Sequence, residues 1–280
     1  MNGEGEMRWP DGTVYTGTFV SDRLQGAGKI IYPDGKVYEG QFKNGLANGR
    51  GLLTHPDRKT YLGSFRDNLK QGKGMLTWPD GIKYTGDFSN DKAQGNGEKI
   101  WPDGIKYVGQ FKDNKVTGKG VKTYPDGTRY KGSFVDNKAS GRGQKFWADG
   151  VKYSGLFKSD MPNGKGTRIN PDGSRYSGTF KNGKKHGRGT YKWYTKGNKQ
   201  ANKYVGAYKD DYKHGKGTEI LTDGSKYKGQ FKNNLRNGKG TLKTADKVTY
   251  QGDFVDGERT GRGIMQWPNK DKYIGDFVEN

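Results

Sequence analysis

The sequence predicts an all-β fold, an elongated single-layer twisted antiparallel sheet of about twelve stacked β-hairpins. A Tyr-x-Gly-x-Phe/Tyr motif recurs every 23 residues, and a Gly-x-Gly pair accompanies each copy. A turn sequence such as Pro-Asp-Gly lies between most of these pairs and the tyrosine that follows. A fixed period in this range is typical of a repeat array. Glycine pairs and prolines at this spacing would interrupt any helix.

The tyrosine motif defines the repeat and its phase. It opens at Tyr15, Tyr38, Tyr61, Tyr84, Tyr107, Tyr130, Tyr153, Tyr176, Tyr204, Tyr227, Tyr250 and Tyr273. The step from Tyr176 to Tyr204 is 28 residues, because extra residues follow Trp193. We therefore expect residues 1–280 to be a single array of twelve 23-residue hairpin units with one loop insertion at 194–202.

The turn sequence closes each hairpin. In the segment 78–81 (Trp-Pro-Asp-Gly), the proline presets φ and the aspartate bonds to nearby backbone. The glycine accepts a left-handed conformation. Such a turn between two short aromatic-bearing runs predicts a β-hairpin, and hence 24 strands in total. Segments such as 20–25 are expected to join one hairpin to the next.

Side-chain alternation separates two faces of the sheet. Tyr, Gly and Phe of each motif have the same parity and predict a buried aromatic face, on which rings lie flat over glycine backbone. Gly26, Gly28 and Tyr32 are placed on that face too. Phe111 and Tyr130 are therefore expected to be buried.

The opposite parity carries basic residues in two sets. The inter-glycine set lies between the paired glycines and comprises Arg50, Lys73, Lys119, Arg142, Lys165, Arg188, Lys216, Lys239 and Arg262. The pre-tyrosine set comprises Lys83, Lys106, Arg129, Lys152, Arg175, Lys203, Lys226 and Lys272. Two interpretations stay open: a solvated face that keeps the sheet soluble, or an electrostatic track for an acidic partner.

The composition bounds the chemistry. The formal net charge is +21 and there is no cysteine, so neither disulfides nor thiolate metal sites can form. No apolar signal segment begins the sequence, and the three histidines lie in different repeats. Neither a phosphate-binding loop nor a Gly-x-Ser-x-Gly motif occurs. We expect no catalytic residues, no metal site, no cofactor and no enzymatic activity, and a cytoplasmic location.

The repeat resembles the MORN repeat (membrane occupation and recognition nexus). Residues 107–111, 118–120 and 124–127 form a full example of its pattern, and the resemblance covers essentially the whole sequence. It implies a sheet of stacked hairpins. It also implies the roles found in the family: scaffolds of protist cytoskeletal complexes, ciliary radial spoke components, membrane-bridging junctophilins and plant phosphatidylinositol phosphate kinases. A sequence of repeats alone favours the scaffold branch.

Three functions follow as expectations. The first is a non-catalytic scaffold in a cytoskeletal or ciliary (axonemal) assembly that binds acidic protein surfaces. Homodimers through sheet edges would involve Tyr273, Ile274, Phe277 and Val278. The alternative is a peripheral membrane protein that binds anionic phospholipids, such as phosphoinositides, through the basic face. Nucleic acid is disfavoured, because rings recurring about every 10 Å along a sheet match stacked bases poorly.

Overall fold

The computed structural model describes residues 1–197 and 199–278, which form β-strands and turns. The all-β prediction is confirmed: the strands number twenty-four, they pair antiparallel in consecutive hairpins, and the described residues contain no helix. No helix long and apolar enough to span a bilayer occurs in the described residues. The chain divides into two compact units, Met1–Lys138 and Ala139–Asn280.

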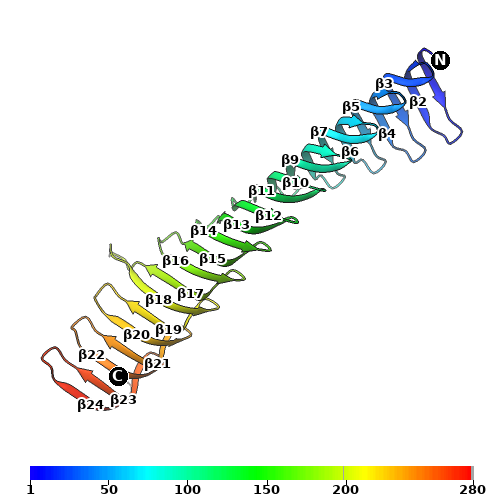
Figure 1. The fold of residues 1–280 in the computed structure, drawn as a ribbon. Coiled ribbons are helices and arrows are strands. Elements are labelled where there is room, and N and C mark those ends of the chain that lie inside the picture. The colour runs from blue at the N-terminus through cyan, green and yellow to red at the C-terminus, as the bar shows by residue number, and fades with distance from the viewer. Residues whose placement is uncertain (198, 279–280) are drawn as a thin grey trace. The chain divides into compact units, whose positions relative to one another are not determined.

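The first unit holds the strands β1 to β12 (Figure 1). They are β1 (Gly3–Arg8), β2 (Val14–Val20), β3 (Arg23–Ile31), β4 (Val37–Lys43), β5 (Leu46–Thr54), β6 (Thr60–Arg66), β7 (Leu69–Thr77), β8 (Lys83–Ser89), β9 (Lys92–Ile100), β10 (Lys106–Lys112), β11 (Lys115–Thr123) and β12 (Arg129–Val135).

The second unit holds the strands that follow, the first of which begins one residue before the division. They are β13 (Lys138–Phe146), β14 (Lys152–Lys158), β15 (Met161–Ile169), β16 (Arg175–Lys181), β17 (Lys184–Trp193), β18 (Asn202–Lys209), β19 (Tyr212–Ile220), β20 (Lys226–Lys232), β21 (Leu235–Lys243), β22 (Thr249–Val255), β23 (Glu258–Gln266) and β24 (Lys272–Phe277). The extra residues after Trp193 lie between β17 and β18, and residue 198 of that segment is outside the described residues.

The Pro-Asp-Gly turns use the chemistry that their sequence predicts. Gly81 has φ +85° and donates its N–H to the Trp78 carbonyl at 2.9 Å. The Asp80 carboxylate accepts the Ile82 N–H at 3.1 Å. Where the glycine is replaced, Arg58 and Lys270 take the same left-handed conformation, with φ of 71° and 77°. The turn geometry therefore survives the loss of its preferred residue.

A second tight turn connects each hairpin to the next, which corrects the expectation of six-residue joining segments. Val20 pairs directly with Arg23, so only Ser21 and Asp22 form the turn. Both have positive φ, 48° and 61°, as in the type I′ turns that match the twist of paired strands. Interior strands thus pair on both sides.

Asparagine or aspartate at the second position of this turn ties consecutive turns together. The Asn137 N–H donates to the Val116 carbonyl at 3.0 Å, and Asn137 Oδ1 accepts the Val116 N–H at 2.9 Å. The same reciprocal pair is made by Asn68, Asp91, Asn114, Asp160, Asp211 and Asn234. These residues combine tolerance of the left-handed region with a local acceptor.

The aromatic face is the core, as predicted. Tyr107 is fully buried, and Phe111 and Tyr130 are 4% and 3% exposed. The Tyr107 ring makes edge-to-face contacts with Phe111 at 5.3 Å and with Phe134 of the next repeat at 5.0 Å. Such pairs contribute about 0.5–1.5 kcal/mol each beyond their burial. A single row of rings therefore supplies the core of a one-layer sheet.

The two glycines of each Gly-x-Gly pair have different roles. A Cβ on Gly120 would lie 2.5 Å from Tyr107 Cε2, so the second glycine makes room for the ring. Gly118 has φ +58° and sits where the register between β10 and β11 shifts, so its role is conformational. Gly26 lies opposite Phe42 of the aromatic face, whereas Tyr32, which was placed on that face too, is only half-buried.

Candidate functional site

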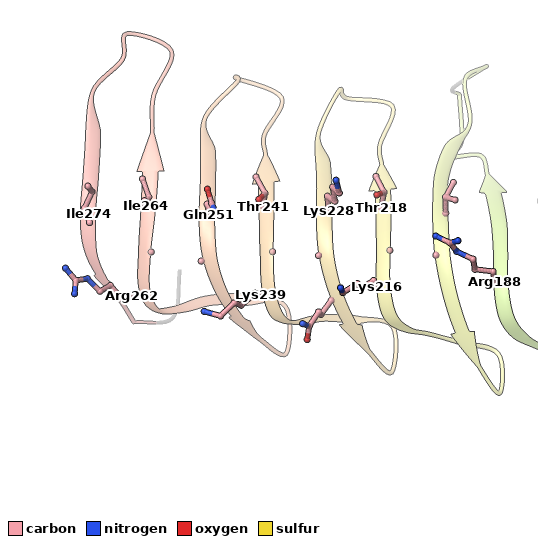
Figure 2. Close-up of a pocket in the computed structure, with 18 residues that line it drawn as sticks. Arg188, Lys216, Thr218, Lys228, Lys239, Thr241, Gln251, Arg262, Ile264 and Ile274 are labelled. Atoms are coloured by element: carbon pink, nitrogen blue, oxygen red, sulfur yellow. The ribbon is translucent and has the colours of Figure 1, made fainter.

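The face opposite the tyrosines, here called the ladder face, carries three rows of side chains. In β19 and β20, Lys216 lies opposite Gln230 in the inter-glycine row and Thr218 lies opposite Lys228 in the middle row. Lys226 belongs to the third, pre-tyrosine row. Figure 2 shows the first two rows in the second unit. Lys216, Lys239 and Arg262 belong to the inter-glycine row, and Ile264 and Ile274 stand at the end of the middle row.

Both predicted basic sets lie on the ladder face. All nine members of the inter-glycine set are exposed, as are the members of the pre-tyrosine set except Lys203, which is half-buried. Arg50, Lys73 and Lys119 of the inter-glycine set belong to the first unit. The other six belong to the second unit. The structure thus assembles a longer run of cations in the second unit.

The two units differ in charge on this face. In the first unit, the three rows contain nine basic and five acidic residues. The acidic residues are Glu4, Glu6, Glu39, Asp87 and Glu98. In the second, the acidic residues are two, Asp253 and Asp276. The basic residues there are fourteen, namely Arg142, Lys152, Lys165, Arg175, Arg188, Lys192, Lys203, Lys216, Lys226, Lys228, Lys239, Lys243, Arg262 and Lys272.

Cations of the first unit are partly neutralised by their neighbours. Lys73 Nζ lies 2.6 Å from Asp87 Oδ1, and Lys106 Nζ lies 2.6 Å from Glu98 Oε2. The hydrogen bond from Lys73 is the main reason that the pKa of Asp87 falls below its ordinary value. The neighbouring carboxylates therefore weaken the attraction of these two lysines for an acidic partner.

Four consecutive cations of the second unit face only neutral residues across the strand pair. Arg142, Lys165, Arg188 and Lys216, here called the open rungs, lie opposite Leu156, Thr179, Ala207 and Gln230 respectively. Among the described residues, no ion pair joins any of the four to a carboxylate. Beyond them, Lys239 approaches Asp253 at 3.5 Å. The open rungs thus present unneutralised charge.

The ladder face of the second unit is hollowed into a groove of about 1070 Å³. Arg188, Lys216, Lys239 and Arg262 line it on one side and the middle row on the other (Figure 2). Main-chain atoms of glycines such as Gly217 and Gly229 also line it, because side chains at these positions would point to the tyrosine face. Grooves of about 650 Å³ and 830 Å³ lie on the first unit.

Lys192, Lys228 and Lys243 also lie on the ladder face, and the sequence-based sets missed them. They occupy positions that are basic in only a few repeats, so a search for residues that recur in most repeats does not find them. Their parity and their register opposite Arg175, Thr218 and Lys226 place them there. Parity applied residue by residue would have found them.

The tyrosine face shows no catalytic arrangement in the described part of the chain. Glu219, 12% exposed, pairs with Lys213 and, at 3.3 Å, with Arg236. Lys213 and Arg236 also cover the rings of Tyr204 and Tyr227 at 5.1 and 4.9 Å. These charges are therefore engaged in the fold. No group of three or more His, Cys, Asp or Glu side chains that could hold a metal ion occurs within residues 1–197 and 199–278.

The candidate edge residues lie on and after β24, which pairs with β23. Tyr273, Ile274 and Val278 are 46%, 60% and 85% exposed, whereas the equivalent Tyr250 is 1% exposed. Phe277 packs against Tyr250 and Tyr273. Their role in joining two chains stays a prediction.

The repeat model of one family matches almost the entire chain. The MORN repeat matches residues 1–14, 15–37, 38–60, 61–83, 84–106, 107–129, 130–152, 153–175, 176–197, 204–226, 227–249 and 250–272. The chain therefore belongs to the MORN repeat family, and the resemblance noted from its sequence is confirmed. No curated protein matches the chain.

Several solved structures share a distant likeness. The TCP domain of Drosophila melanogaster SAS-4 (dCPAP), solved with a proline-rich motif of Ana2, is 15% identical with a TM-score of 0.36, over 63% of this chain and 90% of that one. The TCP10 domain of Danio rerio CPAP, solved with a STIL peptide, is 14% identical with a TM-score of 0.30, over 98% of each chain. A virginiamycin B lyase of Staphylococcus aureus is 14% identical with a TM-score of 0.15, over 99% and 95%. At these TM-scores the likenesses identify neither a partner nor an activity.

Proposed function

We propose that this MORN repeat protein is a non-catalytic interaction scaffold in a cytoskeletal or ciliary assembly, whose second unit binds acidic segments of partner proteins along the ladder face. Of the open rungs, Arg188 and Lys216 line the groove there, and Arg142 and Lys165 continue the same row beyond it. One observation carries the proposal: fourteen basic residues share that face with two acidic ones, and four successive rungs face neutral neighbours. A one-sign groove concentrates ligands of the opposite charge and speeds their association.

The shape of the face favours a chain-like partner. A planar bilayer meets the rims of a hollow first, whereas a polypeptide segment can lie along its floor. Main-chain atoms of Gly217, Gly229, Gly240 and Gly252 line the floor, because side chains at these positions would point to the tyrosine face, so a ligand backbone can approach the sheet between the two rows. The hydroxyls of Thr218 and Thr241 also line it and can donate hydrogen bonds to the carbonyls of such a segment.

The second candidate is binding to anionic phospholipids through the same face. The inter-glycine and pre-tyrosine rows both carry cations, and each Lys or Arg near an anionic membrane surface contributes about 1 kcal/mol. Reversing the charge of Lys119, Arg142 and Lys165 would remove salt-sensitive sedimentation with anionic vesicles if this candidate holds. Charge alone supports it, whereas charge and groove shape together support the acidic polypeptide.

The test is binding of a fluorescent twelve-residue polyglutamate peptide, followed by anisotropy at about 150 mM salt, where exposed charges beyond roughly 8 Å are screened. The four open rungs are changed together to glutamine. We expect the dissociation constant to rise at least about tenfold, because four unneutralised cations are lost.

A matched control removes the same charge elsewhere. Lys196, Lys199, Lys247 and Lys270 are exposed in hairpin turns of the second unit, outside its strands, and changing them to glutamine should leave the peptide affinity nearly unchanged. Equal losses of affinity in both quadruple variants would mean that binding depends only on the net charge of the protein, and this would overturn the proposed site. Location is tested by microscopy of the tagged chain in ciliated cells, where a diffuse cytosolic signal would overturn the assembly part.

A further inference from the structure

We propose that the bound segment lies along the open rungs in a polyproline II conformation and carries a carboxylate at every third residue. The inference rests on the proposed function, since it specifies the acidic partner that binds along this face, from Arg142 and Lys165 into the groove at Arg188 and Lys216. The conformation is inferred from the spacing between successive cations, which is a separate property from the net charge and from the volume of the groove.

The rungs repeat at a fixed distance along the sheet. The open rungs lie on β13, β15, β17 and β19, so one uncharged strand position separates each from the next. Neighbouring strands are about 4.8 Å apart, which places successive rungs about 9.6 Å apart. A ligand that engages all four must present anions at this interval over roughly 29 Å.

A polyproline II helix matches that interval. It has three residues per turn and rises about 3.1 Å per residue, so every third side chain points the same way about 9.3 Å further on. The mismatch is about 0.3 Å per rung and about 1 Å over the three steps between four rungs. Long, flexible Lys and Arg side chains absorb this difference.

The other regular conformations fit less well. In a β-strand, residues three apart point to opposite faces, and residues two apart are only about 6.7 Å apart. In an α-helix, the same-face interval nearest to the rung spacing is seven residues, or about 10.5 Å. Each step then exceeds the distance between rungs by about 1 Å. Across four rungs, the helix drifts by about 3 Å, three times the drift of polyproline II.

The middle row supports the same conformation. Thr167, Thr190 and Thr218 stand two residues after the open rungs Lys165, Arg188 and Lys216, on the same face. A polyproline II segment makes no internal hydrogen bonds, so its carbonyls need external donors. The Thr190 and Thr218 hydroxyls can donate to them while the cations hold the carboxylates. The Thr167 hydroxyl can do so while it accepts a hydrogen bond from the Ser177 hydroxyl, 3.0 Å away.

The test compares labelled peptides of one composition by anisotropy on the full chain. The first is (Glu-Pro-Gln)4, with glutamate at every third position. The second contains the same residues with glutamates at positions one, three, five and seven. We expect the first to bind about tenfold more tightly, because it engages four rungs where the second reaches two or three.

Two further measurements separate spacing from conformation and from position on the protein. (Glu-Gly-Gln)4 keeps the spacing but lacks the preset conformation, and it should bind more weakly than the proline peptide. Arg188→Gln removes an interior rung and should lower the affinity for (Glu-Pro-Gln)4 several-fold, whereas Lys73→Gln, at the equivalent position of the first unit, should not.

The outcomes are distinct. If both glutamate–proline peptides bind equally and both lose affinity in the open-rung variant, the acidic-partner function stands and the polyproline II inference is overturned. If neither binds the unmodified chain at physiological salt, both proposals fail. Binding of anionic vesicles together with failure of all peptides would replace them with the phospholipid alternative.

Discussion

The ring of Tyr107 lies over Gly120 on the neighbouring strand, with its hydroxyl donating to the Gln110 carbonyl at 3.1 Å. No side chain fits between them, since a Cβ on Gly120 would lie 2.5 Å from Tyr107 Cε2. The same arrangement recurs in other repeats, such as that of Tyr227 over Gly240. One contact between a tyrosine and a glycine thus explains why both recur every 23 residues.

Gly120→Ala should therefore destabilise the chain by about 3 kcal/mol, because the methyl group forces the ring or the strand to move. The measurement is the free energy of unfolding from urea denaturation followed by circular dichroism. Gly127→Asn is the control, since Gly127 has φ +88° and open space around it, and asparagine tolerates that conformation. A loss at Gly127 as large as that at Gly120 would contradict the packing explanation.

Two tyrosines of one motif should respond in opposite ways to loss of the hydroxyl. Tyr204 Oη donates to the Ala207 carbonyl at 3.0 Å, so Tyr204→Phe should cost about 1–2 kcal/mol. Tyr208 takes the place of the usual phenylalanine, and its buried hydroxyl has no hydrogen-bond partner in the described residues. Tyr208→Phe should be neutral or stabilising by up to about 1 kcal/mol.

Thermal unfolding of the two single variants checks this contrast. The exposed Tyr212 supplies a control, and Tyr212→Phe should change stability by less than about 0.5 kcal/mol. Equal destabilisation by both core variants would mean that the Tyr208 hydroxyl has a partner, such as a buried water.

Much of the fold was predictable because it repeats. Parity alone placed Tyr107 and Phe111 in the core and Lys216 on the other face, and the turn at 78–81 followed from its residues. The conformational role of Gly118 was not predictable, because the bulge that requires it depends on strand register. The two-residue turns were missed because most of them, such as Ser21-Asp22, lack the glycine that Asn44-Gly45, Asn182-Gly183 and Asp256-Gly257 have.

The candidate site was predictable only in part. The recurrent cations were visible, but their neutral partners were not, since Ala207 lies opposite Arg188 only once the register is known. The contrast with Lys73, which Asp87 neutralises, depends on the same register. The groove depends on the curvature of the strands, which the repeat pattern does not specify.

The turn-to-turn contacts give a third prediction. Asn137→Ala removes the acceptor for the Val116 N–H and places alanine at φ 69°, so it should cost about 2 kcal/mol. Asn137→Gly restores the backbone freedom without the acceptor and should cost about half as much. Urea denaturation of both variants separates the two contributions. An alanine variant no less stable than the glycine variant would contradict the role of the left-handed conformation.

Alkaline pH should unfold the chain through its buried tyrosines. Burial raises the pKa of Tyr61, Tyr107 and Tyr153 to about 12, above the ordinary value of 10. Below pH 10 these phenols are protonated in both states, and their contribution to stability is fully present. Between pH 10 and 12 only the unfolded chain loses these protons, so stability falls by about 1.4 kcal/mol per tyrosine per pH unit.

The check is a series of thermal melts from pH 7 to 11.5, with phenolate absorbance recorded at 295 nm. The melting temperature should change little from pH 7 to 9 and then fall steeply above pH 10. The absorbance of the buried tyrosines should rise with the loss of circular dichroism, since ionisation requires exposure of the ring. A rise of their absorbance near pH 10 while the sheet signal persists would show that the rings ionise inside the fold, against the tight packing of Tyr107 on Gly120.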